Sequence, residues 1–385
     1  MWAGVPWWFW VIHYFKLLSN KKKSVNETNK NPNLVEAQSV QKFVYELFVA
    51  AGLNHERAES VSRLLVLTDM MGRSTHGVSQ VKLYLDQLAS GGMSKTSDYK
   101  VVRDTGATIV WDGDYLPGLW LVERALAVGY ERLRKHGVVT FSIKHSHHIG
   151  CLAALVKDAA DRGYFVTLLS SGPHGKYVAP FGGTQALFSP NPIAYGIPSR
   201  VRPVLVDMTA SITTVSMTRE KVKNGTQFDR PWMLDSTGHP TTDPRVLEVS
   251  DPRGSMMLLG GLDSGHKGFG LAIMVEALTQ ALSGHGRKDA PKRWGASVYL
   301  QLIDPDAFSG LEAFCDQMDF FIDACHANSP VDAAVPVRLP GEQADKNIQA
   351  SQINGIFVST QTRAELVECA NKLGVPIPSS DFSKC

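Results

Sequence analysis

Apolar residues recur at helical spacing along the first folded part of the chain. One stretch, closed by Gly52, places six apolar side chains on one side, namely Val40, Phe43, Val44, Leu47, Phe48 and Ala51. A second follows the capping residue Asn54 and includes Ala58, Val61, Leu64 and Leu65, and a third, ended by Gly91-Gly92, includes Val78, Val81, Leu85 and Leu88. This period is that of amphipathic helices, so the pattern predicts a helical layer up to about residue 92.

Beyond this layer, short β-rich runs alternate with helical stretches. Helices are predicted over residues 119–135 and 150–161, and strands over 138–143, 164–169 and 203–208. The later part adds helices over 266–283, 308–327 and 362–373, strands over 296–303 and 355–358, and a turn-like LPGEQ at 339–343. Such alternation is typical of an α/β sheet domain.

The first 33 residues do not share this pattern. Four of the eight tryptophans lie in the first ten residues, and the uncharged run 1–15 would extend only about 22 Å as a helix, short of the roughly 30 Å hydrocarbon core of a membrane. Basic residues follow this run instead of preceding it, unlike those of a secretion signal. A membrane-surface anchor is therefore not favoured over a flap packed on the protein or a segment foreign to the fold. Polar residues 24–33 are predicted to form a linker.

Composition narrows the class of protein. The 39 Lys and Arg residues nearly balance 37 Asp and Glu, giving a formal net charge of +2. Nucleic-acid binding, which needs a concentrated basic face, is not expected. The five cysteines include no C-x-x-C pair, which argues against a disulfide scaffold or a zinc ribbon and favours a reducing, cytoplasmic location.

The usual nucleotide-binding motifs are missing from the sequence. No G-x-G-x-x-G follows a predicted strand, and no G-x-x-x-x-G-K-[ST] occurs. Those loops cradle phosphates in the common dinucleotide and nucleoside-triphosphate folds. Any nucleotide bound by this chain must therefore be held in another way.

Thr75-His76-Gly77 is the first candidate for chemistry. It lies between the second and third predicted helices. An imidazole titrates near neutral pH and can pass a proton to a developing alkoxide, and Gly77 would let a ligand approach the backbone. A histidine that merely caps a helix is the alternative, and spacing alone favours it.

Three histidines form the second candidate, in the segment His145-Ser146-His147-His148-Ile149-Gly150. The segment follows a predicted strand and opens a helix, which is where α/β proteins bind ligands and anions. Zinc is one alternative, but His147 and His148 would point apart on an extended strand, so we expect no metal. A polar turn that starts a helix is the other alternative.

Two further candidates lie later in the chain. Asp207 ends the predicted strand 203–208, where a carboxylate can orient an imidazole, although most such residues only cap a turn. The segment Gly265–Gly270 places His266 and Lys267 at the start of a long helix, which suits a phosphate or the edge of a nicotinamide ribose. Glycines that only permit tight helix packing are the alternative there.

Taken in order, these motifs resemble the malate/L-lactate dehydrogenase family, which includes ureidoglycolate, diketogulonate and piperideine-carboxylate reductases and is distinct from the Rossmann lactate dehydrogenases. The motifs are T-H-G-V with Tyr84 eight residues after His76, S-H-H-I-G, P-F-G-G, N-P-I-A-Y-G-I-P, V-D-M, W-x-x-D-x-x-G-x-P-T, G-H-K-G-F-G-L and L-P-G-E, within residues 34–375. The resemblance implies an α/β (α+β), non-Rossmann fold. It also implies a mixed-sheet NAD(P)-binding domain over 116–329 and a helical substrate and dimer domain over 34–115, completed by about 330–385, after an extension over 1–33.

The resemblance also implies a function. The chain would be a homodimeric oxidoreductase that uses NAD or NADP to interconvert a 2-oxo acid, or a cyclic imino acid, with its 2-hydroxy or amino acid. His76 would donate the proton, with Thr75 in place of the usual serine and Asp207 completing the relay. The cofactor would be bound by His148, Ile149, Gly150, Cys151, Leu152, His266, Lys267 and Gly268, and the substrate by Tyr84, Gln80 and Asn191.

The sequence departs from the family at positions that bind anions. Gln80 stands where the pattern S-H-G-V-x-R has an arginine that grips the substrate carboxylate, Ser189-Pro190 replaces the Gly-Thr of G-T-N-P, and the segment 213–217 has neither arginine nor lysine. These changes indicate altered or weakened substrate use. A non-catalytic paralogue that keeps the dimer and nucleotide binding is therefore the alternative function, and a zinc hydrolase using the His145–His148 cluster is a third.

Overall fold

The computed structural model of the chain describes residues 33–249, 252–378 and 382. The expected N-terminal extension, with its apolar run and any membrane contact, lies outside these residues except for Asn33. Within the described ranges, no helix is both long enough and apolar enough to cross a membrane.

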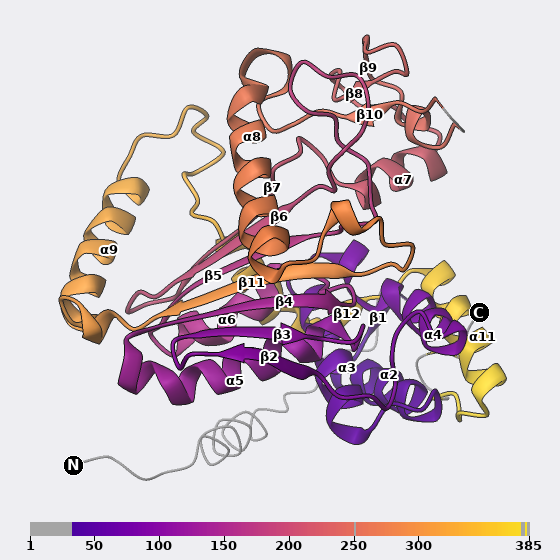
Figure 1. Cartoon of the computed structure of the whole chain (residues 1–385), viewed down its shortest axis with the longest axis horizontal. Coiled ribbons are helices and arrows are strands. Elements are labelled where there is room, and N and C mark those ends of the chain that lie inside the picture. The colour runs from indigo at the N-terminus through magenta and orange to yellow at the C-terminus, as the bar shows by residue number, and fades with distance from the viewer. Residues whose placement is uncertain (1–32, 250–251, 379–381, 383–385) are drawn as a thin grey trace.

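A seven-stranded mixed sheet forms the centre of the molecule (Figure 1). Its strand order is β2 (Lys100–Asp104), β3 (Thr108–Asp112), β4 (Val138–Ser146), β11 (Ala296–Ile303), β5 (Phe165–Ser171), β6 (Pro192–Ile197) and β7 (Val204–Thr209). Only β3 and β4 pair in parallel, and every other neighbouring pair is antiparallel. The expected α/β fold with a mixed sheet is confirmed, and its largely antiparallel pairing differs from the mostly parallel sheet of a Rossmann fold.

Helices cover both faces of the sheet. α5 (Gly118–His136) and α6 (Leu152–Asp161) pack on the face that carries Leu168 and Leu300. α8 (Gly261–Glu276), which continues as a π-helical turn at Ala277–Ala281, packs on the face that carries Leu169 and Tyr299. Because neighbouring residues of a strand point to opposite faces, apolar runs such as those of β5 and β11 serve both layers.

The helical layer predicted for the first part of the chain is confirmed. It consists of α2 (Ala37–Ala50), α3 (His55–Met70) and α4 (Val81–Ser90). The side chain of Asn54 accepts a hydrogen bond from the Arg57 backbone N–H and so caps α3, as expected. The third helix starts later than its apolar pattern suggests, because two short 3-10 helices, η1 (Ser74–His76) and η2 (Val78–Gln80), precede it.

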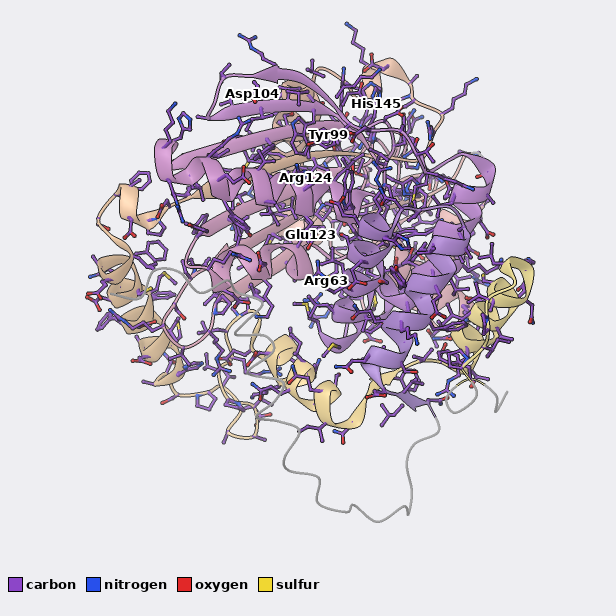
Figure 2. The ribbon with its side chains drawn as sticks, turned by 90° about the horizontal axis from the view of Figure 1, so that it is seen from below. Arg63, Tyr99, Asp104, Glu123, Arg124 and His145 are labelled. Carbon is purple, nitrogen blue, oxygen red and sulfur yellow. The ribbon has the colours of Figure 1, made fainter. Side chains whose placement is uncertain are left out.

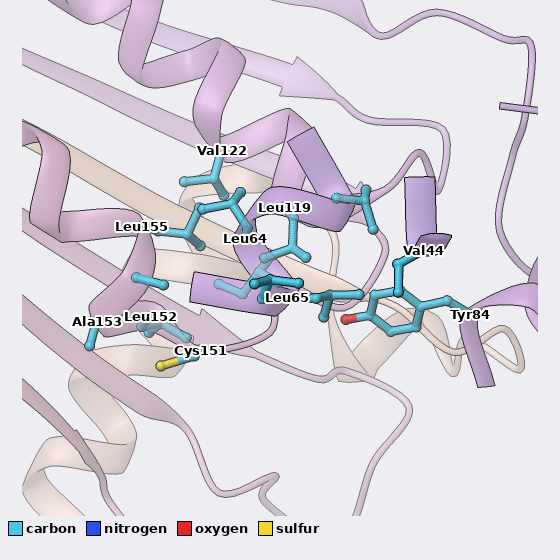
Figure 3. Close-up of a cluster of buried hydrophobic side chains, with 14 of the residues drawn as sticks. Val44, Leu64, Leu65, Tyr84, Leu119, Val122, Cys151, Leu152, Ala153 and Leu155 are labelled. Atoms are coloured by element: carbon cyan, nitrogen blue, oxygen red, sulfur yellow. The ribbon is translucent and has the colours of Figure 1, made fainter. Parts of the chain in front are cut away.

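An ion pair joins this layer to the sheet domain. Arg63 on α3 pairs with Glu123 on α5, and the Ser60 hydroxyl donates to the same carboxylate (Figure 2). Apolar side chains of α3, α5 and α6 also pack together, with Leu65 and Leu119 in one cluster (Figure 3). The two parts therefore share a core.

A smaller lobe, formed by the chain between β7 and α8, lies above the large sheet in Figure 1. It contains α7 (Val215–Lys223) and a three-stranded sheet of β10 (Ser255–Met256), β8 (Met233–Leu234) and β9 (Pro240–Thr241). Three further 3-10 turns complete the chain's short elements, at Pro244–Leu247, Arg287–Asp289 and Pro305–Ala307. Neither α7 nor this small sheet is evident from the hydrophobic pattern, because both are short.

The C-terminal part returns to the helical layer. After α9 (Leu311–His326), the turn-like LPGEQ leads into α10 (Glu342–Asn354), a helix that the sequence analysis did not predict. β12 (Ile356–Phe357) then pairs antiparallel with β1 (Leu34–Val35), and α11 (Thr360–Leu373) follows it. The expected division into domains stays a prediction, and β2 and β3 belong to the large sheet although they precede its expected start at residue 116.

Leu65 tests the shared core. Its side chain is fully buried, so we expect Leu65→Ala to lower the free energy of unfolding by about 2–5 kcal/mol through lost contacts and a residual cavity. Leu282→Ala is the matched control, since Leu282 is 55% exposed and its loss should cost about 0.5 kcal/mol or less. Urea unfolding of both variants measures the difference, and equal losses would contradict this account of the core.

Candidate active site

The carboxyl ends of β4, β5 and β7 lie at the same edge of the large sheet. β4 and β5 both run antiparallel to β11, and β7 is separated from β5 by two antiparallel pairings, so all three point the same way. A cavity of about 730 Å³ is lined by residues at the ends of these strands, including His148, Gly172 and Asp207. The turn between α3 and α4 contributes His76 and Gln80 to the same lining.

His76 ends η1, and its Nδ1 lies 2.9 Å from the Thr75 hydroxyl. Burial lowers the pKa of His76 below its ordinary value, while the negative charge of Asp207 raises it and the positive charge of Arg73 lowers it. Its ring stacks on that of His148 with the centroids 5.9 Å apart. The proton-donor candidate therefore sits in the cavity with one ring nitrogen already bonded.

Tyr84 holds His148 in place from behind the cavity. The Tyr84 hydroxyl lies 2.7 Å from Nδ1 of His148, and its ring is buried among apolar side chains (Figure 3). Burial lowers the pKa of His148 to about 3 and raises the pKa of Tyr84 far above its ordinary range. Both groups are thus neutral at pH 7, and a hydroxyl that donates to Nδ1 leaves the His148 proton on Nε2. The expected role of Tyr84 in binding substrate stays a prediction, and the structure shows its hydroxyl in contact with His148.

Gln80 braces the turn that carries His76. Its side-chain amide donates to the Thr75 carbonyl oxygen across 2.7 Å. The amide group is thereby engaged within the protein, although the residue lines the cavity.

Asp207 reaches the cavity from β7 but does not bond to His76 in the described structure. Its carboxylate accepts hydrogen bonds from the Ala153 backbone N–H, at 3.1 Å, and from the Cys151 thiol, at 3.5 Å. It thus satisfies a free N–H at the start of α6. Its influence on His76 is through charge, and the direct hydrogen-bond partner of that imidazole is Thr75.

Residues 148–152, expected to bind the cofactor, all line the cavity. The other expected cofactor residues do not. His266 and Lys267 are exposed on α8, and Gly268 packs so closely that a Cβ there would lie 2.5 Å from the Leu259 carbonyl oxygen. Close helix packing, the alternative considered for these glycines, accounts for Gly268.

Asn191, expected to bind substrate, is fully buried outside the cavity lining. Its amide donates to Glu276 Oε1 at 2.9 Å and to the Ala272 carbonyl oxygen at 3.3 Å, both on α8. The residue therefore ties the start of β6 to α8.

The histidine cluster does not form a metal site in the described part of the chain, where no group of three or more histidine, cysteine or acidic residues could hold a metal ion. His145 bonds to Asp112 instead, with Nδ1 2.9 Å from the carboxylate. His147 is fully buried beside Trp294, and burial lowers its pKa to about 3.

The cavity residues that were missed from the sequence include Arg73, His174, Arg219 and Trp294. Arg73 is three residues before His76, so the motif itself could have signalled it. His174 follows β5 and Trp294 precedes β11, and only the antiparallel pairing of these strands brings them to one edge. Arg219 lies on the unpredicted helix α7.

The cavity suits a nicotinamide dinucleotide. Its volume falls within the range usual for such ligands, roughly 300–1,000 Å³, and Trp232 and Trp294 supply flat apolar surface. His174 Nδ1 is buried without a hydrogen-bond partner in the described structure, so it can bond to a ligand. The lining thus combines the stacked pair of His76 and His148 with flat apolar surface and a hydrogen-bonding group that is available to a ligand.

Comparison with known proteins identifies the group to which this site belongs. Residues 35–367 match the family model described as malate/L-lactate dehydrogenase. A malate dehydrogenase of Pyrococcus abyssi is 28% identical over 342 residues, covering 86% of this chain and 93% of its own length. Hydroxycarboxylate dehydrogenase B of Escherichia coli is 27% identical over 348 residues, covering 89% and 94%.

A solved malate dehydrogenase of Entamoeba histolytica superimposes with a TM-score of 0.84 at 23% identity, over 90% of this chain and 99% of that one. This likeness confirms the non-Rossmann fold. The chain belongs to the malate/L-lactate dehydrogenase family. It is an oxidoreductase of the dehydrogenase type, as its motifs predicted.

The turn that carries His76 packs against the carboxyl group of Asp69. Asp69, near the end of α3, accepts a hydrogen bond from the Val78 backbone N–H at 2.7 Å, and a Cβ on Gly77 would lie 2.2 Å from the carboxyl oxygen Oδ1 of Asp69. Gly77 therefore makes room for Asp69, whereas the sequence analysis expected it to admit a ligand. Burial raises the pKa of Asp69 to about 7, with the Val78 bond acting in the opposite direction.

This raised pKa predicts a pH-dependent stability. Between the unfolded value of 3.8 and about 7, the folded chain holds a proton that the unfolded chain releases, so stability falls as the pH rises. Asp69→Asn keeps an acceptor for the Val78 N–H but cannot titrate. We expect the free energy of urea unfolding of the wild type to fall relative to that of the variant between about pH 4.5 and pH 7.5.

The exposed Asp229 provides the control, since Asp229→Asn should follow the wild type across this range. Parallel pH curves for the wild type and Asp69→Asn would contradict the prediction.

Proposed function

We propose that this chain is an NAD(P)H-dependent reductase that converts a 2-oxo acid, or a cyclic imino acid, to the 2-hydroxy or amino acid, and catalyses the reverse reaction. The observation that carries the proposal is the imidazole of His76, bonded at Nδ1 by Thr75 and stacked on the neutral His148 in the cavity. Family membership supports the reaction type.

The residues that would hold the cofactor are those of the segment 148–152, with Trp294 and His174 facing the same space. When bound, a reduced nicotinamide supplies the hydride for the carbonyl or imine carbon. His266, Lys267 and Gly268 were also expected to bind it. Their position on α8 supports this role less well than the cavity position of the 148–152 segment.

His76 would protonate the substrate oxygen or nitrogen as the carbon is reduced. The form of His76 that can give up a proton is the imidazolium, in which Nδ1–H donates to the Thr75 hydroxyl oxygen and Nε2 carries the transferred proton. Asp207 would assist through its charge, which favours the protonated form of His76. The neutral His148, held by Tyr84, would donate a hydrogen bond from Nε2 without adding a second positive charge.

Two alternatives remain for comparison. A non-catalytic paralogue would bind the dinucleotide without turnover, but the retained His76 and Thr75 pair favours an active enzyme. A zinc hydrolase would need convergent ligands, and His145 is bonded to Asp112 in the described structure. Both are less well supported than the reductase.

We propose a homodimer in the cytoplasm as the working form. On α9, only Cys315 is buried, and Phe320 and Phe321 are 75% and 59% exposed, an apolar surface that a second subunit would cover. The cysteines of the described residues are unpaired, which favours a reducing compartment.

Loss of the proton donor tests the proposed reaction. We expect His76→Ala to lower kcat/KM for 2-oxo acid reduction by about 10²–10⁴-fold, the usual contribution of general acid catalysis, while the Kd for NADPH changes little. Oxidation of NADH and NADPH with a panel of 2-oxo acids and cyclic imino acids measures the first quantity. His239→Ala is the matched control, because the His239 side chain is 80% exposed outside the cavity lining. Undiminished turnover in His76→Ala would refute the assignment.

The hydroxyl of Thr75 can be tested separately. Thr75→Val removes the partner of Nδ1 at nearly constant volume, so we expect kcat to fall about 10–100-fold with little change in KM. Thr75→Ser keeps the hydroxyl and should retain most of the activity. Equal activity of the Val and Ser variants would show that the hydroxyl does not orient the imidazole.

A further inference from the structure

Gln80 lines the cavity with a neutral side chain. Gln80 stands where the family pattern has an arginine, and its amide is occupied by the Thr75 carbonyl oxygen. A neutral amide cannot replace the paired, charge-assisted hydrogen bonds of a guanidinium. A 2-oxo acid would therefore need a cation elsewhere in this cavity.

Arg73 is such a cation. It lies in the turn before His76 and lines the same cavity, and its guanidinium forms no ion pair or hydrogen bond with any described residue. The His76 backbone N–H donates to the Arg73 carbonyl oxygen at 2.9 Å, so Arg73 and His76 belong to one turn of the cavity lining. An arginine without a protein partner, facing a cavity, keeps its full capacity for a ligand anion.

The other charged groups of the cavity leave this role to Arg73. Asp207, the carboxylate of the lining, is bonded to Ala153 and Cys151. Arg219 is also exposed and unpaired in the described structure, but it lies on α7 and not in the turn that carries His76.

We propose that Arg73 binds the substrate's carboxylate beside His76, in place of the arginine that the family pattern has at the position of Gln80. The inference rests on the proposed function, and it specifies the substrate as an acid whose carboxylate is attached directly to the reacting carbon. In a 2-oxo acid these two groups are one bond apart, so the cation and the proton donor must lie on the same side of the cavity. Arg73 and His76 lie three positions apart in one turn and so meet that requirement.

Binding of oxalate, a two-carbon dianion that resembles the substrate's carboxylate end, tests the proposal without requiring turnover. Isothermal titration of the full chain with oxalate, with and without NADPH, would compare the wild type with Arg73→Gln and Arg73→Lys. We expect Arg73→Gln to raise the Kd for oxalate about 10–100-fold, the range for one lost charge-assisted group, and Arg73→Lys to raise it less. Arg103→Gln is the matched control, since Arg103 is exposed and unpaired on β2 outside the cavity lining.

Several outcomes would overturn the proposal. They are wild-type protein that does not bind oxalate at millimolar concentration, an unchanged Kd in Arg73→Gln, equal losses in the Gln and Lys variants, or a loss in Arg219→Gln that exceeds the loss in Arg73→Gln. Each of these results would show that oxalate is bound by another group, or that its binding does not depend on the Arg73 guanidinium.

Kinetics distinguish this proposal from the proposed function. If the wild type reduces a 2-oxo acid, Arg73→Gln should raise KM about 10–100-fold with little change in the Kd for NADPH, and should move the pH midpoint of kcat/KM upward, because the Arg73 charge lowers the pKa of His76. Turnover that does not change in Arg73→Gln would support the reductase and contradict carboxylate binding by Arg73. Oxalate binding that depends on Arg73, in a protein without turnover on the panel, would support carboxylate binding by Arg73 and contradict the reductase.

Discussion

The structure depends on the insertion of one late strand into the centre of the sheet. β11 pairs antiparallel with β4 on one side and with β5 on the other, although some 125 to 150 residues separate it from them along the chain. This double pairing forces β4 and β5 to run in the same direction, so that the loops after both strands emerge at one edge. The start of β11 reaches the same edge and adds Trp294. Without β11, β4 and β5 would not be joined in one sheet, and the loops that follow them would not line one cavity.

The second constraint is the attachment of the His76 turn to the helical layer. Asp69 packs against Gly77 and accepts a hydrogen bond from the Val78 N–H, while the Gln80 side chain donates one to the Thr75 carbonyl oxygen. These two bonds fix a turn that has little regular structure of its own. The Arg63 and Glu123 pair and the packing of α3 on α5 then set this turn against the sheet edge. The proposed proton donor, His76, is therefore positioned by contacts that involve no ligand.

Burial and neighbouring charges set different pKa values for the histidines in and around the cavity. His147 and His148 are kept neutral because burial disfavours their charged forms, whereas His76 receives opposing influences from Asp207 and Arg73. A proton can therefore move at His76 without creating adjacent positive charges in the cavity. Among the described lining residues, fixed positive charge comes from Arg73 and Arg219, and these favour an anionic ligand.

The sequence by itself was sufficient to predict the helices and strands with strong periodicity and to identify the family. The helices around Val40–Ala51 and Ala58–Leu65, the strands at 138–143 and 296–303, and the ordered motifs from T-H-G-V to G-H-K-G-F-G-L were all readable locally. Elements such as α7, α10 and β6 were missed. α7 and β6 are short, and the 13 residues of α10 are mostly polar, so these segments carry little periodic signal. The His76 and His148 stack, the diversion of Asp207 to α6, and the burial of Asn191 against α8 were decided only by tertiary structure. These contacts join residues far apart in sequence, and a local pattern states which groups are present but not which of them meet.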